Sequence, residues 1–173
     1  MANTYVAIAT TTVGSGGTAN ITFSSIPATY TDLAILVSLR SNNSAVFDNV
    51  KITFNNNTSS YNYRSLNGNG SAASSDSFTS DPADKIIGII NGDTSTASTF
   101  GSLYVYIPNY AGSTNKSLAI DSVSENNATT AYARIAANLW SNTAAITSIK
   151  LEPYAGTSFN QHSTATLYGI KNS

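Results

Sequence analysis

The sequence predicts an all-β protein, an antiparallel sandwich or barrel. We favour a β-sandwich that is jelly-roll-like, with about eight to ten short strands. The first observation is the kind of apolar residue. The chain has 15 Ile and 7 Val against 9 Leu, and β-branched side chains fit a pleated, half-buried surface. The second is that short segments alternate between apolar and polar residues, as strands with one buried face do. The third is the frequency of turn residues, which interrupt the chain about every 10–20 residues.

Ten segments are expected to form strands. In chain order they cover 4–12, 19–24, 33–40, 50–54, 85–91, 103–107, 117–124, 131–139, 146–152 and 163–170. The alternation is clear in 33–40, where four apolar residues share one face: Leu33, Ile35, Val37 and Leu39. The Ala-rich stretch 128–140 has a helical alternative, because three of its residues have i, i+4 spacing: Ala131, Ile135 and Leu139. We favour the strand there.

Turn residues separate the expected strands. Gly14-Ser15-Gly16-Gly17 can reverse the chain through positive φ, so we expect residues 4–24 to form a first hairpin. Similar breaks are the runs Asn55-Asn56-Asn57 and Asn91-Gly92-Asp93. The four prolines fall at expected strand ends, where a missing N–H costs no ladder hydrogen bond: Pro27, Pro82, Pro108 and Pro153.

The length of 173 residues predicts a single domain over 1–173. The longest interruption in the pattern of expected strands begins with Asn67-Gly68-Asn69-Gly70 and continues as a Ser/Ala run. We therefore expect a long surface loop at about 67–84. Segments 108–115 and 153–160 resemble each other through a shared Tyr-Ala-Gly sequence. We interpret them as two hairpins with the same turn chemistry, and an ancient duplication is the alternative.

The composition narrows the classes of function. Ser, Thr and Asn number 26, 22 and 20, whereas charged residues make up only 10% of the chain. The net charge of −1 gives no basic surface for nucleic acid. Without Cys and with one His, the chain lacks a Cys nucleophile, a disulfide framework and a Cys-type zinc site. No signal peptide or membrane span is visible. We therefore expect a non-enzymatic protein with no cofactor and no membrane contact.

Few polar residues are candidates for chemistry. We expect His162 to be an exposed turn residue rather than a catalytic base, because no Gly-x-Ser-x-Gly motif accompanies it. Asp76, Asp81 and Asp84 could begin a calcium site, although solvated loop carboxylates are the favoured interpretation. Asp121 and Glu125 share one strand face and could in principle serve glycoside hydrolysis.

Two further motifs carry no prediction of a site. The Gly-rich runs are not followed by Gly-Lys-Ser/Thr, so no nucleotide site is expected. Asn-x-Ser/Thr triplets occur about as often as the composition predicts by chance, so they do not indicate glycosylation. These triplets begin at Asn20, Asn42, Asn56, Asn57, Asn69, Asn115 and Asn127.

The aromatic residues are the best remaining candidates for binding. They could stack on sugar rings or anchor a protein partner, although packing in the core or at a sandwich edge is the favoured role for any single Tyr. The candidates are Tyr61, Tyr63, Tyr104, Tyr106, Tyr110, Tyr154 and Trp140.

Four segments carry a resemblance to a known family. They are Ser25-Ile26-Pro27-Ala28-Thr29-Tyr30-Thr31-Asp32-Leu33, Ile107-Pro108-Asn109-Tyr110-Ala111-Gly112-Ser113, Glu125-Asn126-Asn127-Ala128-Thr129 and Ala165-Thr166-Leu167-Tyr168-Gly169-Ile170. With them the chain resembles small Ser/Thr/Asn-rich accessory virion structural proteins of tailed bacteriophages, from Tyr5 to Lys171. The shared motifs are turns and strand ends, so the resemblance transfers no functional residue.

The resemblance implies a passive structural role on the outer surface of a phage particle assembled in the host cytoplasm. Our first hypothesis is a capsid decoration (cement) protein that binds the major capsid protein, stabilises the assembled shell and forms a homotrimer, since a trimer fits a threefold lattice point. The alternative is a tail- or fibre-associated module that binds a host-surface glycan through exposed Tyr and Asn. A third hypothesis is a hydrolase of cell-wall polysaccharide. The resemblance alone leaves head and tail locations open.

Overall fold

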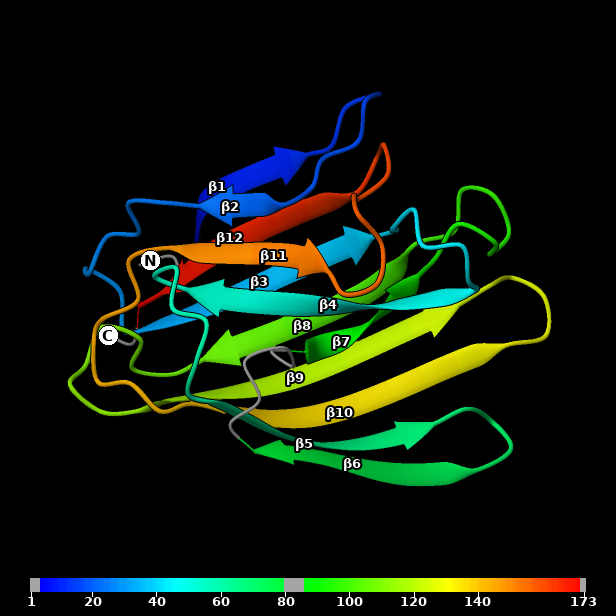
Figure 1. Ribbon diagram of the computed structural model, residues 1–173. Coiled ribbons are helices and arrows are strands. Elements are labelled where there is room, and N and C mark those ends of the chain that lie inside the picture. Colours follow the sequence, from blue (N-terminus) through cyan, green and yellow to red (C-terminus); the bar gives the residue numbers. More distant parts are fainter. Residues whose placement is uncertain (1–3, 80–85, 172–173) are drawn as a thin grey trace.

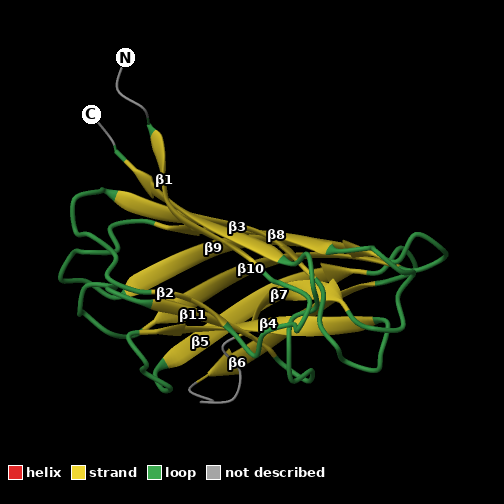
Figure 2. Ribbon diagram, turned by 90° about the horizontal axis from the view of Figure 1, so that it is seen from above, coloured by secondary structure: helices red, strands yellow, loops and turns green. Residues whose placement is uncertain are grey.

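The computed structural model describes residues 4–79 and 86–171, and these residues form two antiparallel sheets that pack face to face. This confirms the predicted β-sandwich. The larger sheet has eight strands in the order β1-β12-β3-β8-β9-β10-β5-β6, and the smaller has four in the order β2-β11-β4-β7. Figure 1 shows the smaller sheet lying across the larger one, and Figure 2 shows the two layers from above. The described residues include no helix that is long and apolar enough to cross a membrane.

Twelve strands are present in the described residues, and all ten predicted strands are among them. Their bounds are β1 Tyr5–Thr12, β2 Ile21–Phe23, β3 Asp32–Leu39, β4 Phe47–Phe54, β5 Tyr61–Gly68, β6 Ala73–Thr79, β7 Ile86–Asn91, β8 Gly101–Ile107, β9 Lys116–Glu125, β10 Ala131–Trp140, β11 Ile149–Pro153 and β12 Thr164–Ile170. The segment with a helical alternative is β10, a strand that pairs with β9 on one side and β5 on the other.

The alternating apolar residues point between the sheets. In β3, Leu33, Ile35 and Leu39 are fully buried, and in β9 every second residue is buried along all ten positions. At one end of the core, the ring of Trp140 lies 5.3 Å from that of Phe54 and 6.2 Å from that of Tyr61. These three rings come from β10, β4 and β5, so they join the two sheets.

A close approach between the layers depends on Gly88 in β7. A Cβ atom built at this position would lie 2.6 Å from Leu103 Cδ1 and 3.0 Å from Ser122 Cβ. A larger residue would require Leu103 and Ser122 to shift, so glycine allows β7 to pack closely on β8 and β9. All six residues of β7 are buried.

Buried polar side chains hold the loops at one end of the sandwich. The Arg40 guanidinium is almost fully buried and donates to the backbone carbonyls of Asp93 and Ser95, both at 2.9 Å, and of Thr96 at 2.7 Å. Asp48 accepts from the backbone N–H groups of Ala155 and Gly156 at 3.0 and 2.9 Å. These charge-assisted bonds fix the loops without a salt bridge between the two residues.

The predicted hairpin over 4–24 is wrong. Gly14–Gly17 does form a turn, with Gly17 N–H bonded to Gly14 C=O at 3.1 Å and Gly17 at φ +67°. However, β1 pairs with β12 in the large sheet, whereas β2 pairs with β11 in the small one. The glycine run therefore connects a strand of the large sheet to a strand of the small sheet, rather than joining two paired strands. The pairing is set by strands that are distant in the sequence.

The predicted long loop at 67–84 is also largely wrong. β5 continues to Gly68, a short turn follows, and β6 occupies Ala73–Thr79 as the edge strand of the large sheet. Residues 80–85, which include Pro82 and two of the candidate calcium ligands, lie outside the described residues. All seven residues of β6 are exposed, so no apolar alternation was needed for it to form.

The two similar segments occupy different places in the topology. Residues 108–115 join the paired strands β8 and β9, but residues 153–160 connect β11 in the small sheet to β12 in the large one. The interpretation of both as hairpins is therefore wrong for the second. Pro108 follows β8 and Pro153 ends β11, as predicted for prolines at strand ends.

Candidate docking surface

The outer face of the eight-stranded sheet, the face turned away from the small sheet, is apolar and exposed. Seven large apolar side chains in the described residues are exposed, and five of them lie on this face: Tyr5, Leu36, Leu66, Val123 and Ile135. Leu66 is 66% exposed and Ile135 is 64% exposed. Exposed apolar side chains gathered on one surface, rather than scattered singly, are typical of a binding face. We call this surface the outer face.

The register of the strands aligns the centre of the outer face. Leu36 on β3 lies opposite Tyr104 on β8, and Tyr104 lies opposite Asp121 on β9. Asp121 in turn lies opposite Ile135 on β10, and Ile135 lies opposite Leu66 on β5. Because side chains at directly opposite positions are close neighbours, the five residues form one row across five strands.

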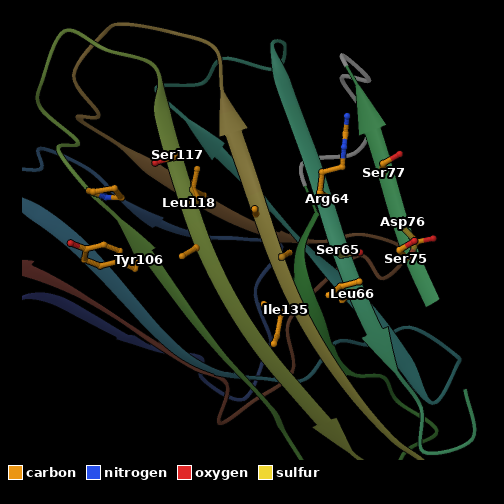
Figure 3. A pocket seen from close by; sticks show the side chains of 14 residues that line it. Arg64, Ser65, Leu66, Ser75, Asp76, Ser77, Tyr106, Ser117, Leu118 and Ile135 are labelled. Carbon is orange, nitrogen blue, oxygen red and sulfur yellow. The ribbon is translucent and has the colours of Figure 1, made fainter. Parts of the chain in front are cut away.

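A hollow of about 820 Å³ lies beside this row. Its floor is low because two small residues, Ala119 and Ala137, stand between Tyr106 and Arg64 in the strand register. Figure 3 shows the labelled side chains around it, with Tyr106 and Arg64 on well-separated strands. Two smaller hollows of about 260 and 210 Å³ border Tyr104 and Asp121 on the same face. The outer face is therefore uneven enough to receive protruding groups of a partner.

Two half-buried tyrosines are held in place on this face. The Tyr106 hydroxyl donates to Asp32 Oδ2 at 2.8 Å, and this hydrogen bond to a carboxylate raises the pKa of Tyr106. The hydroxyls of Tyr104 and Tyr5 lie 3.4 Å apart. Burial, with a smaller contribution from Tyr5, raises the pKa of Tyr104 to about 12. Both rings are therefore neutral at physiological pH and present fixed surfaces.

The two outer surfaces of the sandwich differ in charge. The four-stranded small sheet has three charged side chains on its solvent side, Lys51 on β4 and Lys150 and Glu152 on β11, with Lys150 Nζ and Glu152 Oε2 3.2 Å apart. The outer face spreads three exposed charged side chains over twice as many strands: Arg64, Asp121 and Glu125. An apolar surface with few charges loses little on desolvation, which favours docking on the outer face.

Most of the aromatic binding candidates belong to the core instead. Tyr61 and Tyr63 are 3% and 4% exposed, and Tyr110 and Trp140 are fully buried. The Tyr110 hydroxyl donates to the carbonyl of Pro27, inside the fold. These four residues pack in the core, which was the favoured role for any single Tyr, and their side chains are not available to a partner.

Three of the aromatic candidates remain accessible. Tyr104 and Tyr106 lie on the outer face. Tyr154 is exposed in the loop after β11, where the Lys51 ammonium lies 5.9 Å from its ring centre. It is therefore separate from the outer face.

Asp121 and Glu125 do not have the spacing of a glycosidase carboxylate pair. Asp121 and Glu125 do share the exposed face of β9, but four residues of a strand span about 13 Å. The two carboxyl groups of a glycosidase lie about 5–9.5 Å apart. The hypothesis of a polysaccharide hydrolase rested on this pair of carboxylates, and their spacing does not support it.

The candidate calcium ligands do not form a site in the described residues. Asp76 lies on β6, where its Oδ2 accepts from Asn67 Nδ2 at 2.8 Å, whereas Asp81 and Asp84 lie outside the described residues. Nowhere in 4–79 and 86–171 do three His, Asp or Glu side chains gather as a possible metal site.

His162 is an exposed turn residue, as predicted. It has φ +70°, and its backbone N–H donates to the Val13 carbonyl at 3.0 Å. This conformation has a structural role in the turn before β12.

Four residues of the outer face were not predicted from the sequence to be exposed: Leu36, Leu66, Val123 and Ile135. Leu36, Val123 and Ile135 lie in segments that were correctly predicted as strands. The available signal was an apolar residue on the polar side of an alternating strand, as Leu36 is between Ile35 and Val37. Leu66 could not be placed because β5 had not been predicted.

Comparison with protein-family models, curated proteins and solved structures finds no match for the chain.

Proposed function

We propose that the protein is a non-enzymatic structural protein of a tailed-phage particle, a capsid decoration protein whose outer face docks on the assembled shell of major capsid protein. The observation that carries this proposal is the apolar outer face, with Leu36, Ile135 and Leu66 aligned across the large sheet. The sequence resemblance to accessory virion proteins supplies the biological setting.

The chemistry of this face suits attachment to a preassembled surface. Fully burying a Leu or Ile side chain stabilises a contact by about 1.5–3 kcal/mol, so Leu66 and Ile135 can each contribute a substantial part of the binding free energy. A protein that binds the assembled shell better than free subunits stabilises the shell by mass action. With few ion pairs at the contact, binding should depend only weakly on salt.

The strand order supports a jelly-roll topology as part of the same proposal. Strands β1-β12-β3-β8 of the large sheet face the small-sheet order β2-β11-β4-β7. An eight-stranded ribbon folded over into two sheets has this order, and domains of this kind occur in viral capsids and lectins. In this description β5–β6 and β9–β10 are two hairpins inserted into the ribbon, and both extend the large sheet.

The predicted homotrimer remains part of the proposal for the assembled particle. A three-fold arrangement lets each copy present the same outer face to equivalent shell subunits around a lattice point. Native mass spectrometry of protein released gently from particles tests it, with a mass of three 18.0 kDa chains as the expected result.

The direct test uses phage particles that lack the protein, to which the purified chain is added back. Cosedimentation should show saturable binding, and cryo-electron microscopy should place the chain on the head surface. Ile135→Asp should weaken binding at least tenfold, which corresponds to about 1.4 kcal/mol. Tyr154→Asp is the matched control, because Tyr154 is exposed outside the outer face. Density on the tail alone, or equal binding by both variants, contradicts the proposal.

The hollow of about 820 Å³ favours one alternative, a tail- or fibre-associated module that binds a host-surface glycan. Tyr106 and Pro108 offer apolar contact to a sugar ring, while Arg64, Ser75 and Ser77 offer hydrogen-bonding groups on the opposite side. Binding of the isolated protein to a glycan array, lost in Tyr106→Ala and retained in Tyr154→Ala, supports this alternative. Array binding that Tyr106→Ala does not change counts against it.

A further inference from the structure

The four sheet edges of the sandwich differ in how they are protected. Unpaired edge strands attract strands of other molecules, and proteins block them with bulges, short length, charges, proline or a cover. In the small sheet, β2 is only three residues long and β7 is buried at all six positions. In the large sheet, β1 has an irregularity in its register between Ala7 and Ala9. Each of these three edges therefore has one protective feature, although the one on β1 is confined to a single position.

The fourth edge, β6, has only one of these protections, a single charged residue. Its seven residues pair with β5 in unbroken register from Ala73 to Thr79, and both of its faces are exposed. Its sequence, Ala-Ser-Ser-Asp-Ser-Phe-Thr, contains no Lys, Arg or Pro. Its one charged group, Asp76, already accepts a hydrogen bond from Asn67 of the adjacent β5. Within the described residues, nothing pairs with the outer side of β6.

We propose that β6 pairs with β6 of a second copy of the chain, in an antiparallel, two-fold symmetric contact. An exposed strand edge needs another open edge as its partner, and β6 is the edge that the chain leaves open. Every copy supplies the same edge, so one isologous contact closes both. With the two-fold axis perpendicular to the sheet, the two large sheets become one continuous sheet, and both outer faces lie on the same side.

The position of Asp76 restricts the register of this contact. Full overlap of the two strands puts Asp76 opposite Asp76, and like charges at opposite positions are destabilising. A shift by two residues keeps the exposed faces aligned, because strand side chains alternate. Two registers result from such a shift. In the first, residues 73–77 of the two copies pair antiparallel and Ser75 lies opposite Ser75. In the second, residues 75–79 pair and Ser77 lies opposite Ser77. Asp76 then lies opposite Ser74 or Phe78.

The size of the contact predicts a weak dimer. Five paired residues with mostly small side chains bury less than the roughly 800 Å² per partner of a standard stable interface. We therefore expect dissociation constants of about 10 μM to 1 mM for the free protein. Copies held side by side on a surface would pair more completely, because their local concentration is high. The pairing does not depend on the proposed phage role.

Analytical ultracentrifugation between about 10 μM and 1 mM tests association. The weight-average mass of the wild type should rise from one 18.0 kDa chain toward two. The double variant Ser75→Lys/Ser77→Lys places like charges opposite each other in both registers, and we expect it to stay monomeric throughout. Thr10→Lys/Thr12→Lys on β1 makes the same change at the opposite edge and should associate like the wild type. A monomeric wild type at 1 mM, or a β6 variant that associates unchanged, overturns the proposal.

Single cysteines test the register, since the chain has no Cys of its own. Opposite residues of paired strands have Cα atoms about 4.5–5.5 Å apart, within the range of a disulfide. Mild oxidation should therefore link two copies of Ser75→Cys or of Ser77→Cys several-fold faster than two copies of Ser74→Cys, which never faces itself. Equal rates for all three variants contradict strand pairing, even if the protein associates by another surface.

Discussion

The sandwich core and the β5–β6 hairpin are stabilised differently. In β3 and β9, one side of each strand is covered by the second sheet, and Leu33 and Ile35 are fully buried. In β6 all seven residues are exposed, and the ring of Phe78 stacks with its centre 5.1 Å from that of Tyr63. The comparison shows that a strand can persist on pairing with one neighbour alone, but that burial between two layers supplies most of the stability.

The largest expected effect comes from the core. Trp140→Ala removes a fully buried ring that contacts both Phe54 and Tyr61, and we expect the free energy of unfolding to fall by about 3–5 kcal/mol. Urea denaturation followed by circular dichroism measures it. Trp140→Phe should cost clearly less, because it keeps the aromatic packing. Similar losses in the two variants would show that the ring does not join the sheets.

The next effect depends on pH. Burial raises the pKa of Tyr61 to about 12, from about 10 in an unfolded chain. Stability from the neutral phenol is therefore complete below pH 10 and is lost as the pH rises toward 12, by roughly 2–3 kcal/mol. Urea denaturation from pH 8 to 12 should show a smaller decline in Tyr61→Phe than in the wild type.

Tyr61→Phe should also lower the free energy of unfolding at neutral pH. The Tyr61 hydroxyl accepts from the buried backbone N–H of Phe54 at 2.8 Å, and its loss leaves this donor without that partner, at about 1–2 kcal/mol. Parallel pH profiles for the wild type and the variant would contradict the assignment of the alkaline loss to Tyr61.

The hairpin should respond less than the core. Phe78 is 41% exposed, and Phe78→Ala removes mainly the stacking on Tyr63, for an expected loss of about 1 kcal/mol. Hydrogen exchange should then accelerate in β5 and β6 while β3 stays protected. A loss comparable to that of Trp140→Ala would mean that the hairpin is part of the cooperative core.

The smallest effect is expected on the outer face. Ile135→Ala should change the free energy of unfolding by no more than about 0.5 kcal/mol, since its side chain is 64% exposed. Ile120→Ala on the adjacent strand is the matched control. Ile120 is 3% exposed, and its truncation should cost about 2–4 kcal/mol. Equal losses would show that the outer face stabilises the fold instead of being free to bind.

The sequence allowed the strands of the sandwich to be predicted, but not their partners. β3 and β8 could be located because their apolar residues recur at every second position. β6 could not, because its Ser and Ala residues carry no such pattern, and it becomes a strand by pairing with β5. The outer face was missed for a related reason. Leu36 and Ile135 lie on different strands that only the sheet order places in one row.

Alternation and turn chemistry determine the all-β class, because they depend on neighbours within a few residues. The same local character explains why Gly14–Gly17 was recognised as a turn while its connection was wrong. Which sheet a strand joins depends on hydrogen bonds to residues far along the chain, such as those of β1 with β12. Tertiary structure alone decided that Tyr61 and Trp140 are core residues, that Leu66 and Ile135 are exposed together, and that β6 is left as an open edge. Each of these outcomes is set by what packs against a residue, which its immediate sequence does not contain.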